Sequence, residues 1–285
     1  MTLITLKNNQ LVVKISTLGA ELQSVVDQSN QERIWQAQAD VWPRHAPVLF
    51  PIVGRLRDNH YRLNKQVYEL EQHGFARDCE FEVVNQQDNY VTLKLQADRE
   101  TQTVYPFLFT LEITFILHDN DLQVNYSIQN HGQELMPFAI GGHPGFVFDY
   151  QQPQAQLIIE NPQQVQRLQF TDNNLIDQTQ LQAVSTREIA LNSESFDHDA
   201  WVYQSHGMNS YSIGTPDHYQ IKMTTNSPYF GVWSAYPKKG KFICLEPWWG
   251  LADTEDSDGQ IFHKFGINQL QPQQLFNASW QVTFN

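Results

Sequence analysis

The sequence predicts an all-β protein, a large antiparallel β-sandwich, from two observations. Apolar and polar side chains alternate along several stretches, and clusters of turn-forming residues separate these stretches. Convincing helical periodicity is missing, and no blade-length repeat favours a propeller. The chain has 285 residues, enough to bury a large core, and its composition does not shift as it would at a linker. We therefore expect one domain spanning residues 1–285.

The predicted strands are clearest in three places. Val91, Leu93 and Leu95 alternate with polar residues, and the same period of two runs through residues 122–129 and again through residues 280–284. Turn formers at residues 87–89, 119–121 and 130–132 separate neighbouring runs, which predicts consecutive antiparallel strands. Residues 160–180 are rich in Gln and Asn and predict a loop or an irregular strand.

Composition excludes several classes of protein. The net charge of −13 argues against binding to nucleic acid or to an anionic membrane, and is compatible with a small neutral ligand. Cys79 and Cys244 are the only two cysteines, too few for a disulfide framework or a four-cysteine zinc site. They can form one bridge, but reduced thiols are the simpler expectation. The N-terminal residues lack a signal-peptide pattern, so we expect the protein in the cytoplasm.

Residues 141–146, Gly-Gly-His-Pro-Gly-Phe, differ from ordinary sheet sequence. Glycine permits unusual backbone angles and proline fixes the next φ, so His143 is presented on a stiff turn. Such a histidine is suited to proton transfer. A histidine that only caps a turn fits this segment equally well.

Residues 244–250, Cys-Leu-Glu-Pro-Trp-Trp-Gly, place Glu246 at the expected end of an apolar strand. An aromatic neighbourhood raises the pKa of a carboxylate, which suits a general base near neutral pH. Indole faces also stack on the C–H surfaces of sugars. The alternative is a glutamate paired with an arginine, with the tryptophans in the core.

Two further clusters carry cationic and imidazole side chains. Arg55 ends residues 50–55, while His73 and Arg77 lie in residues 72–78. A guanidinium binds hydroxyls, carboxylates or phosphates, although surface salt bridges are an equally ordinary role. His45 either lines the same cavity or only packs. We expect the acidic residues 253–258 to form a solvated loop, and the scattered histidines predict no metal site.

In this order on an all-β chain, these clusters resemble the aldose 1-epimerase (galactose mutarotase) superfamily over nearly the whole sequence. The motifs at residues 50–55, 73–77 and 141–146 look closest to the branch of mutarotase-like proteins found beside bacterial lactose and tagatose operons. The resemblance implies the galactose mutarotase-like supersandwich fold. It also implies the interconversion of α and β anomers of an aldose, without cofactor or metal.

The resemblance also implies roles for individual residues. Glu246 matches the base that removes the proton of the anomeric hydroxyl, and His143 matches the acid that protonates the ring oxygen. The other matched positions bind substrate. His73 binds near the ring oxygen, and Arg55 and Asp199 bind the sugar. Arg77 matches a position that contacts phosphate in hexose-6-phosphate mutarotase-like relatives, and Trp248 or Phe75 covers a sugar face. Asp197 replaces Asp199 in an alternative alignment.

Other functions stay open. Arg44 and Arg57 join Arg55 and Arg77 in regions that suit a hexose-6-phosphate mutarotase, and a catalytically silent sugar-binding or sensory protein would keep the same cleft. Glycoside hydrolysis fits poorly because no convincing pair of carboxylates is present. The expected partner is a small sugar, free or phosphorylated, with no nucleic acid or membrane, and the expected state is a monomer or homodimer.

Overall fold

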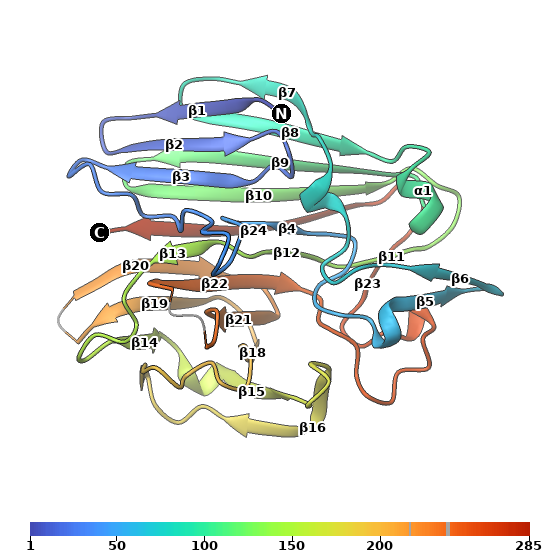
Figure 1. Ribbon diagram of the computed structural model, residues 1–285. Helices are drawn as coiled ribbons and strands as arrows, with labels where there is room; N and C mark the ends of the chain where they lie inside the picture. The colour runs from blue at the N-terminus through green and yellow to red at the C-terminus, as the bar shows by residue number, and fades with distance from the viewer. Residues whose placement is uncertain (217, 238–239) are drawn as a thin grey trace.

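The computed structural model describes residues 1–216, 218–237 and 240–285. Antiparallel sheets make up most of this part of the chain, which confirms the predicted fold class (Figure 1). The predicted strands at residues 91–96, 122–129 and 280–284 lie in β8, β10 and β24. Residues 160–180 form parts of two strands with a register shift between Arg167 and Gln169, in keeping with the irregular strand expected there.

The largest sheet has nine strands over the described residues. The C-terminal strand β24 lies between β10 and β20, so the end of the chain closes the middle of this sheet (Figure 1). In spatial order the strands are β17 (Glu188–Ala190), β14 (Gln156–Ile159), β19 (Asn209–Thr215), β20 (His218–Thr225), β24 (Leu275–Phe284), β10 (Asp121–Asn130), β9 (Phe109–His118), β8 (Tyr90–Gln96) and β7 (Glu82–Gln86).

A second large sheet carries the site described below. Its strands are, in order, β16 (Ile176–Ala183), β15 (Val165–Phe170), β18 (Trp201–Ser205), β21 (Tyr229–Trp233), β22 (Phe242–Trp249), β12 (Ile140–Gly142) and β4 (Val48–Leu49), and β13 (Gly145–Val147) also pairs with β22. Hydrophobic side chains from both large sheets belong to one buried cluster, for example Val124 and Trp280 from the first and Ile243 and Leu245 from the second. Because successive strand residues face opposite ways, Cys244, Glu246 and Trp248 point to the other side of β22.

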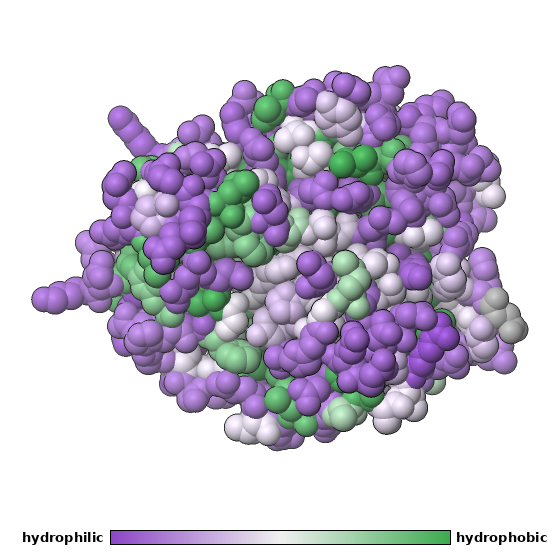
Figure 2. All heavy atoms as spheres, turned by 180° about the vertical axis from the view of Figure 1, so that it is seen from behind, coloured by the Kyte–Doolittle hydropathy of each residue, from purple (hydrophilic) through white to green (hydrophobic). Residues whose placement is uncertain are grey.

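Smaller elements complete the structure. They are the sheet of β1 (Leu3–Lys7), β2 (Leu11–Ser16) and β3 (Leu22–Asp27), the pairs β5 (His60–Leu63) with β6 (Gln66–Glu69) and β11 (Met136–Phe138) with β23 (Asn268–Leu270), the helix α1 (Thr101–Val104), and the 3-10 turns η1 (Arg57–Asn59), η2 (Ala76–Asp78), η3 (Pro162–Gln164) and η4 (Ile261–His263). In the described part of the chain, no helix is long and apolar enough to cross a membrane. On the face seen in Figure 2, hydrophobic side chains form separate patches among mainly hydrophilic ones.

Strand β22 continues three residues past the predicted end, so the expectation that the strand stops at Glu246 is wrong. Proline inside a strand normally removes a ladder hydrogen bond. Here β22 pairs with β13 up to Cys244 and with β12 from Trp248, and the turn containing His143 interrupts the ladder between them. Leu245 N–H points to that side, since it donates to the Pro144 carbonyl. Backbone N–H groups two residues apart on a strand point to the same side. The N–H that Pro247 lacks would therefore also face the side where the ladder is already interrupted.

Candidate active site

A pocket of about 350 Å³ opens over the outer face of β22. This volume lies in the range of small-molecule sites. Its wall combines aromatic rings with titratable side chains, the mixture expected where a polar ligand is held and oriented. The lining residues used below are Trp42, Arg44, Arg55, His73, Arg77, His143, Asp199, Trp233, Glu246 and Trp248.

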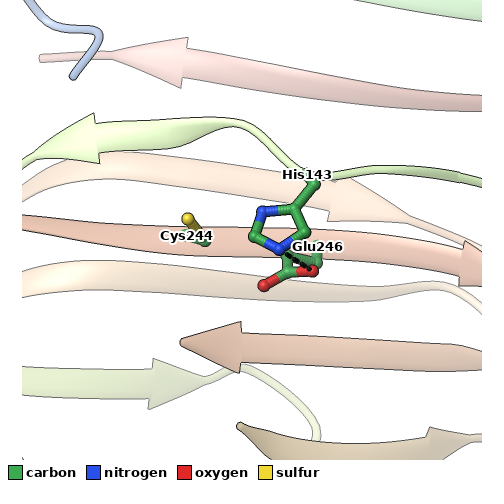
Figure 3. Close-up of side chains that lie close together, drawn as sticks. All are labelled: His143, Cys244 and Glu246. Carbon is green, nitrogen blue, oxygen red and sulfur yellow. Dashed lines mark ion pairs between the residues drawn. The ribbon is translucent and has the colours of Figure 1, made fainter. Parts of the chain in front are cut away.

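Glu246 and His143 meet in this pocket. The carboxylate comes from the middle of β22 and the imidazole from the turn between β12 and β13, which both pair with β22 (Figure 3). His143 Nε2 lies 3.2 Å from Glu246 Oε2, and the two side chains are 11% and 1% exposed. The sequence suggested both residues separately, and the sheet register brings them together.

The pair lies in an unusual electrostatic environment. Burial, and then the negative charge of Asp199, raise the pKa of Glu246 well above its usual value. Burial lowers the pKa of His143 to about 3. Among the described residues, neither carboxylate oxygen has an aligned hydrogen-bond donor. Burial thus disfavours the charged form of each group, and because the two groups are in contact they titrate as a coupled pair.

Two tryptophans that were not predicted as site residues frame His143. Trp42 stacks on the imidazole with ring centroids 5.0 Å apart, and Trp233 meets it edge-on at 5.6 Å. Both rings lie in the pocket wall. Because they restrict the imidazole from two directions, they hold Nε2 toward Glu246. Trp42 lies three residues before His45 in the chain, but nothing in the local sequence links Trp233 to His143.

His73 is locked to the loop that carries Arg55. Gly54 N–H donates to His73 Nδ1 at 3.1 Å, and His73 N–H donates back to the Gly54 carbonyl at 2.9 Å. Burial and the nearby charges of His143 and Arg77 lower the pKa of His73 well below its usual value, so the ring is neutral. With Nδ1 accepting, the proton sits on Nε2, which can donate to a ligand.

Of the two candidate aspartates, Asp199 lines the pocket, whereas Asp197 is half-exposed and faces His198 at 3.9 Å. Asp199 has a left-handed φ of 68°, and its Oδ1 accepts the Ala200 N–H at 2.9 Å. Burial raises the pKa of Asp199, an effect that the Ala200 amide, Arg55 and Trp233 partly offset. The geometry therefore favours Asp199 over Asp197 as the ligand-facing residue.

Three arginines line the pocket: Arg44, Arg55 and Arg77. Asp78 partly neutralises two of them, at 2.8 Å from Arg44 and 3.5 Å from Arg77. Arg55 forms no side-chain ion pair within the described residues, so its guanidinium is available to a ligand. Arg57 lies outside this pocket and donates to the Ser257 carbonyl at 3.0 Å.

The remaining predicted residues are divided between pocket and core. Trp248 lines the pocket. Phe75 packs against Phe50 and other core rings, with centroids 6.2 Å apart, and lies outside the lining set. His45 also lies outside it and pairs with Glu21 at 3.4 Å.

One acidic residue predicted to be solvated is buried instead. Asp253 Oδ1 accepts from Lys264 Nζ at 3.0 Å, and the two side chains are 3% and 2% exposed. Asp253 Oδ2 accepts the Arg57 N–H at 2.9 Å, and the Asp253 N–H donates to the Arg55 carbonyl at 2.8 Å. The counter-charge eleven residues away makes burial possible, and the result is a clamp on the loop of Arg55. Glu255, Asp256 and Asp258 are exposed, as predicted.

Cys244 lies beside the pair, two residues before Glu246 on the same face of β22. One ligand atom from each of His143, Cys244 and Glu246 lies within 4.8 Å of the other two, and all three residues are buried (Figure 3). Cys244 and Cys79 are both free thiols. Apart from its spacing from Glu246, no sequence pattern associates Cys244 with the site.

This fold and pocket occur in a chain that matches a family of carbohydrate epimerases. The chain belongs to the aldose 1-epimerase family, whose model matches residues 2–256. This finding confirms the family predicted from the sequence motifs.

Individual relatives cover almost the whole chain. A galactose mutarotase related enzyme from Lactobacillus acidophilus is 37% identical, with a TM-score of 0.93 over 100% of this chain and 97% of that one. A galactose mutarotase-like protein from Lactobacillus casei is 29% identical, with a TM-score of 0.93 over 100% of both chains. The plasmid-encoded protein LacX of Lactococcus lactis subsp. lactis is 25% identical over 301 residues, covering 98% of each chain. The similarity thus extends to a LacX-like branch of the family.

Proposed function

We propose that the protein interconverts the α and β anomers of a free aldose, with Glu246 as general base and His143 as general acid. The observation that carries the proposal is the buried contact of 3.2 Å between these two groups in the wall of a sugar-sized pocket. Ring opening of a hemiacetal requires one proton to be removed and one to be delivered at two oxygens bound to the same carbon. A carboxylate and an imidazole held side by side meet this requirement.

The proton transfers balance within the pair. The Glu246 carboxylate removes the proton of the C1 hydroxyl, the His143 imidazolium protonates the ring oxygen, and the bond between C1 and that oxygen breaks. The resulting aldehyde rotates about the C1–C2 bond. Ring closure then returns both protons to their original sites and gives the other anomer. No co-reactant is consumed.

Other pocket residues orient the sugar. His73 donates from Nε2 to an oxygen near the acid, because its Nδ1 is already occupied by Gly54. Asp199 accepts from sugar hydroxyls and Arg55 donates to them. Trp248 offers an aromatic wall to the C–H face of the ring.

Polarimetry tests the proposal directly. Freshly dissolved α-glucose and α-galactose are followed to anomeric equilibrium with enzyme and in a matched blank, since mutarotation also occurs spontaneously. We expect a first-order rate that rises in proportion to the enzyme concentration. A rate equal to the blank, together with tight sugar binding, would instead establish a sugar-binding or sensory protein.

A hexose 6-phosphate is the second candidate substrate, because Arg44, Arg55 and Arg77 all line the pocket and only Asp78 pairs with them in the described part of the chain. Such a cluster suits a phosphate dianion. Comparing kcat/KM for glucose and galactose with that for their 6-phosphates separates the two substrates. A preference for the phosphorylated sugar that is lost in Arg77→Gln would establish the second candidate.

A further inference from the structure

We propose that His143, Cys244 and Glu246 form a binding site for one zinc ion, or another thiophilic divalent ion, and that the ion competes with the sugar. The three side chains offer an imidazole nitrogen, a thiol sulfur and a carboxylate oxygen within 4.8 Å of one another (Figure 3). Nitrogen, sulfur and oxygen ligands of these kinds are the ones that zinc prefers.

The geometry is close to that of a tetrahedral site. Zinc bonds of about 2.0–2.2 Å to nitrogen and oxygen place those two atoms roughly 3.3–3.6 Å apart at a tetrahedral angle. The observed separation of His143 Nε2 and Glu246 Oε2 is 3.2 Å. Cys244 Sγ lies within 4.8 Å of the other two ligand atoms. A zinc–sulfur bond of about 2.3 Å places the sulfur roughly 3.6 Å from them, so it must approach by at most about 1.2 Å. The open pocket leaves the fourth position to a water molecule.

Charge balance favours a divalent ion in this buried position. Bound to a thiolate, a carboxylate and a neutral imidazole, the ion leaves the site with no net charge. The thiol proton and the proton shared by His143 and Glu246 leave to solvent as the metal bonds form. Mg²⁺ and Ca²⁺ require more oxygen ligands and do not suit a sulfur-containing set of three.

The consequence for the enzyme rests on the proposed function. The ion occupies the lone pairs that Glu246 and His143 use for proton transfer, so zinc and sugar exclude each other. Cys244 takes no part in the proton transfers, and removing its thiol should therefore separate metal binding from catalysis.

The test uses Co²⁺ as a spectroscopic substitute for zinc. We expect a thiolate-to-cobalt charge-transfer band in the near ultraviolet with one ion bound per chain, displaced by Zn²⁺ and unaffected by Mg²⁺. Cys244→Ser should remove the band and weaken zinc binding by more than about 100-fold, which exceeds the loss typical of outer-shell changes. Cys79→Ser is the matched control, because Cys79 is the other free thiol, and it should leave the band intact.

The outcomes distinguish this site from the proposed function. A band lost only in Cys244→Ser, with mutarotation that resists zinc in the same variant, supports both proposals. A Cys244-dependent band without mutarotation supports the metal site and refutes the proposed activity. No band, or one that survives Cys244→Ser, refutes the metal site whatever the activity shows. Cys244→Ala serves as a second variant if the serine protein does not fold.

Discussion

Replacing Glu246 with glutamine is the most direct test of whether Glu246 acts as the general base. The amide has the shape of the carboxylate but cannot take the proton of the C1 hydroxyl. The side chain is 1% exposed and, within the described residues, accepts no aligned hydrogen bond, so the substitution breaks no structural contact of that kind. We therefore expect a folded protein with little activity.

The magnitude follows from the two roles of the carboxylate. As the proposed general base it should contribute about 10²–10⁴-fold to the rate, equivalent to roughly 3–5 kcal/mol. A carboxylate 3.2 Å from His143 also favours the imidazolium by its charge, so its loss should reduce the fraction of His143 that carries the proton to be donated. Groups that act as one unit give strongly non-additive effects. The double variant Glu246→Gln/His143→Gln should thus be no slower than the slower single variant.

The assay is polarimetry at several enzyme concentrations, with the spontaneous rate subtracted, and circular dichroism establishes folding. Catalysis within about threefold of the wild-type rate would remove Glu246 from the role of base. A double variant whose loss equals the product of the two single losses would show that the residues act independently. Either result would refute the model of one shared proton.

Three further outcomes follow from the structure. Burial lowers the pKa of His143 to about 3, so this imidazole should not titrate through about pH 6.5, where an ordinary histidine does, and kcat/KM should lack a step from His143 there; an NMR titration of His143 with its midpoint at that pH would contradict this. Below about pH 4.5 the unfolded chain carries a proton on both Glu246 and His143, whereas burial of the folded pair opposes uptake of the second proton until about pH 3, so the pair should reduce stability over that window, as urea unfolding with a His143→Gln control would reveal. Lys264→Ala should lower the free energy of unfolding by about 3–5 kcal/mol, because it leaves Asp253 buried and unpaired, whereas a loss below about 1 kcal/mol would show that the pair is solvated.

The strands were predictable where one face is buried and the other is not. Apolar and polar side chains alternate over residues 122–129 because β10 lies between β9 and β24 with one face on the core. An alternation of period two is the direct sequence signal of such a strand. The end of β22 was not predictable in this way. When only neighbouring residues are considered, proline predicts the end of a strand. The gap in the ladder that accommodates Pro247 is created by a segment about a hundred residues earlier in the chain.

The site shows the same division between local and distant signals. Glu246 and His143 stand out by their neighbours in the chain, and the motifs identified the family. Trp233 and the buried state of Asp253 depend on contacts with distant residues, and no local pattern reports them. The aromatic frame around His143 and the clamp on the Arg55 loop therefore required coordinates.

The arrangement of charges suits the proposed base, because no arginine pairs with Glu246 in the described part of the chain. In the proposed reaction the pair is a carboxylate and an imidazolium before ring opening, and a carboxylic acid and an imidazole after it. An arginine bound to Glu246 would stabilise only the first state and oppose proton transfer. Arg55 and Arg77 line the same pocket, yet within the described residues His143 is the only ion-pair partner of Glu246. Burial of an otherwise unpartnered pair brings its two proton arrangements closer in free energy, which is what a reaction that must run in both directions requires.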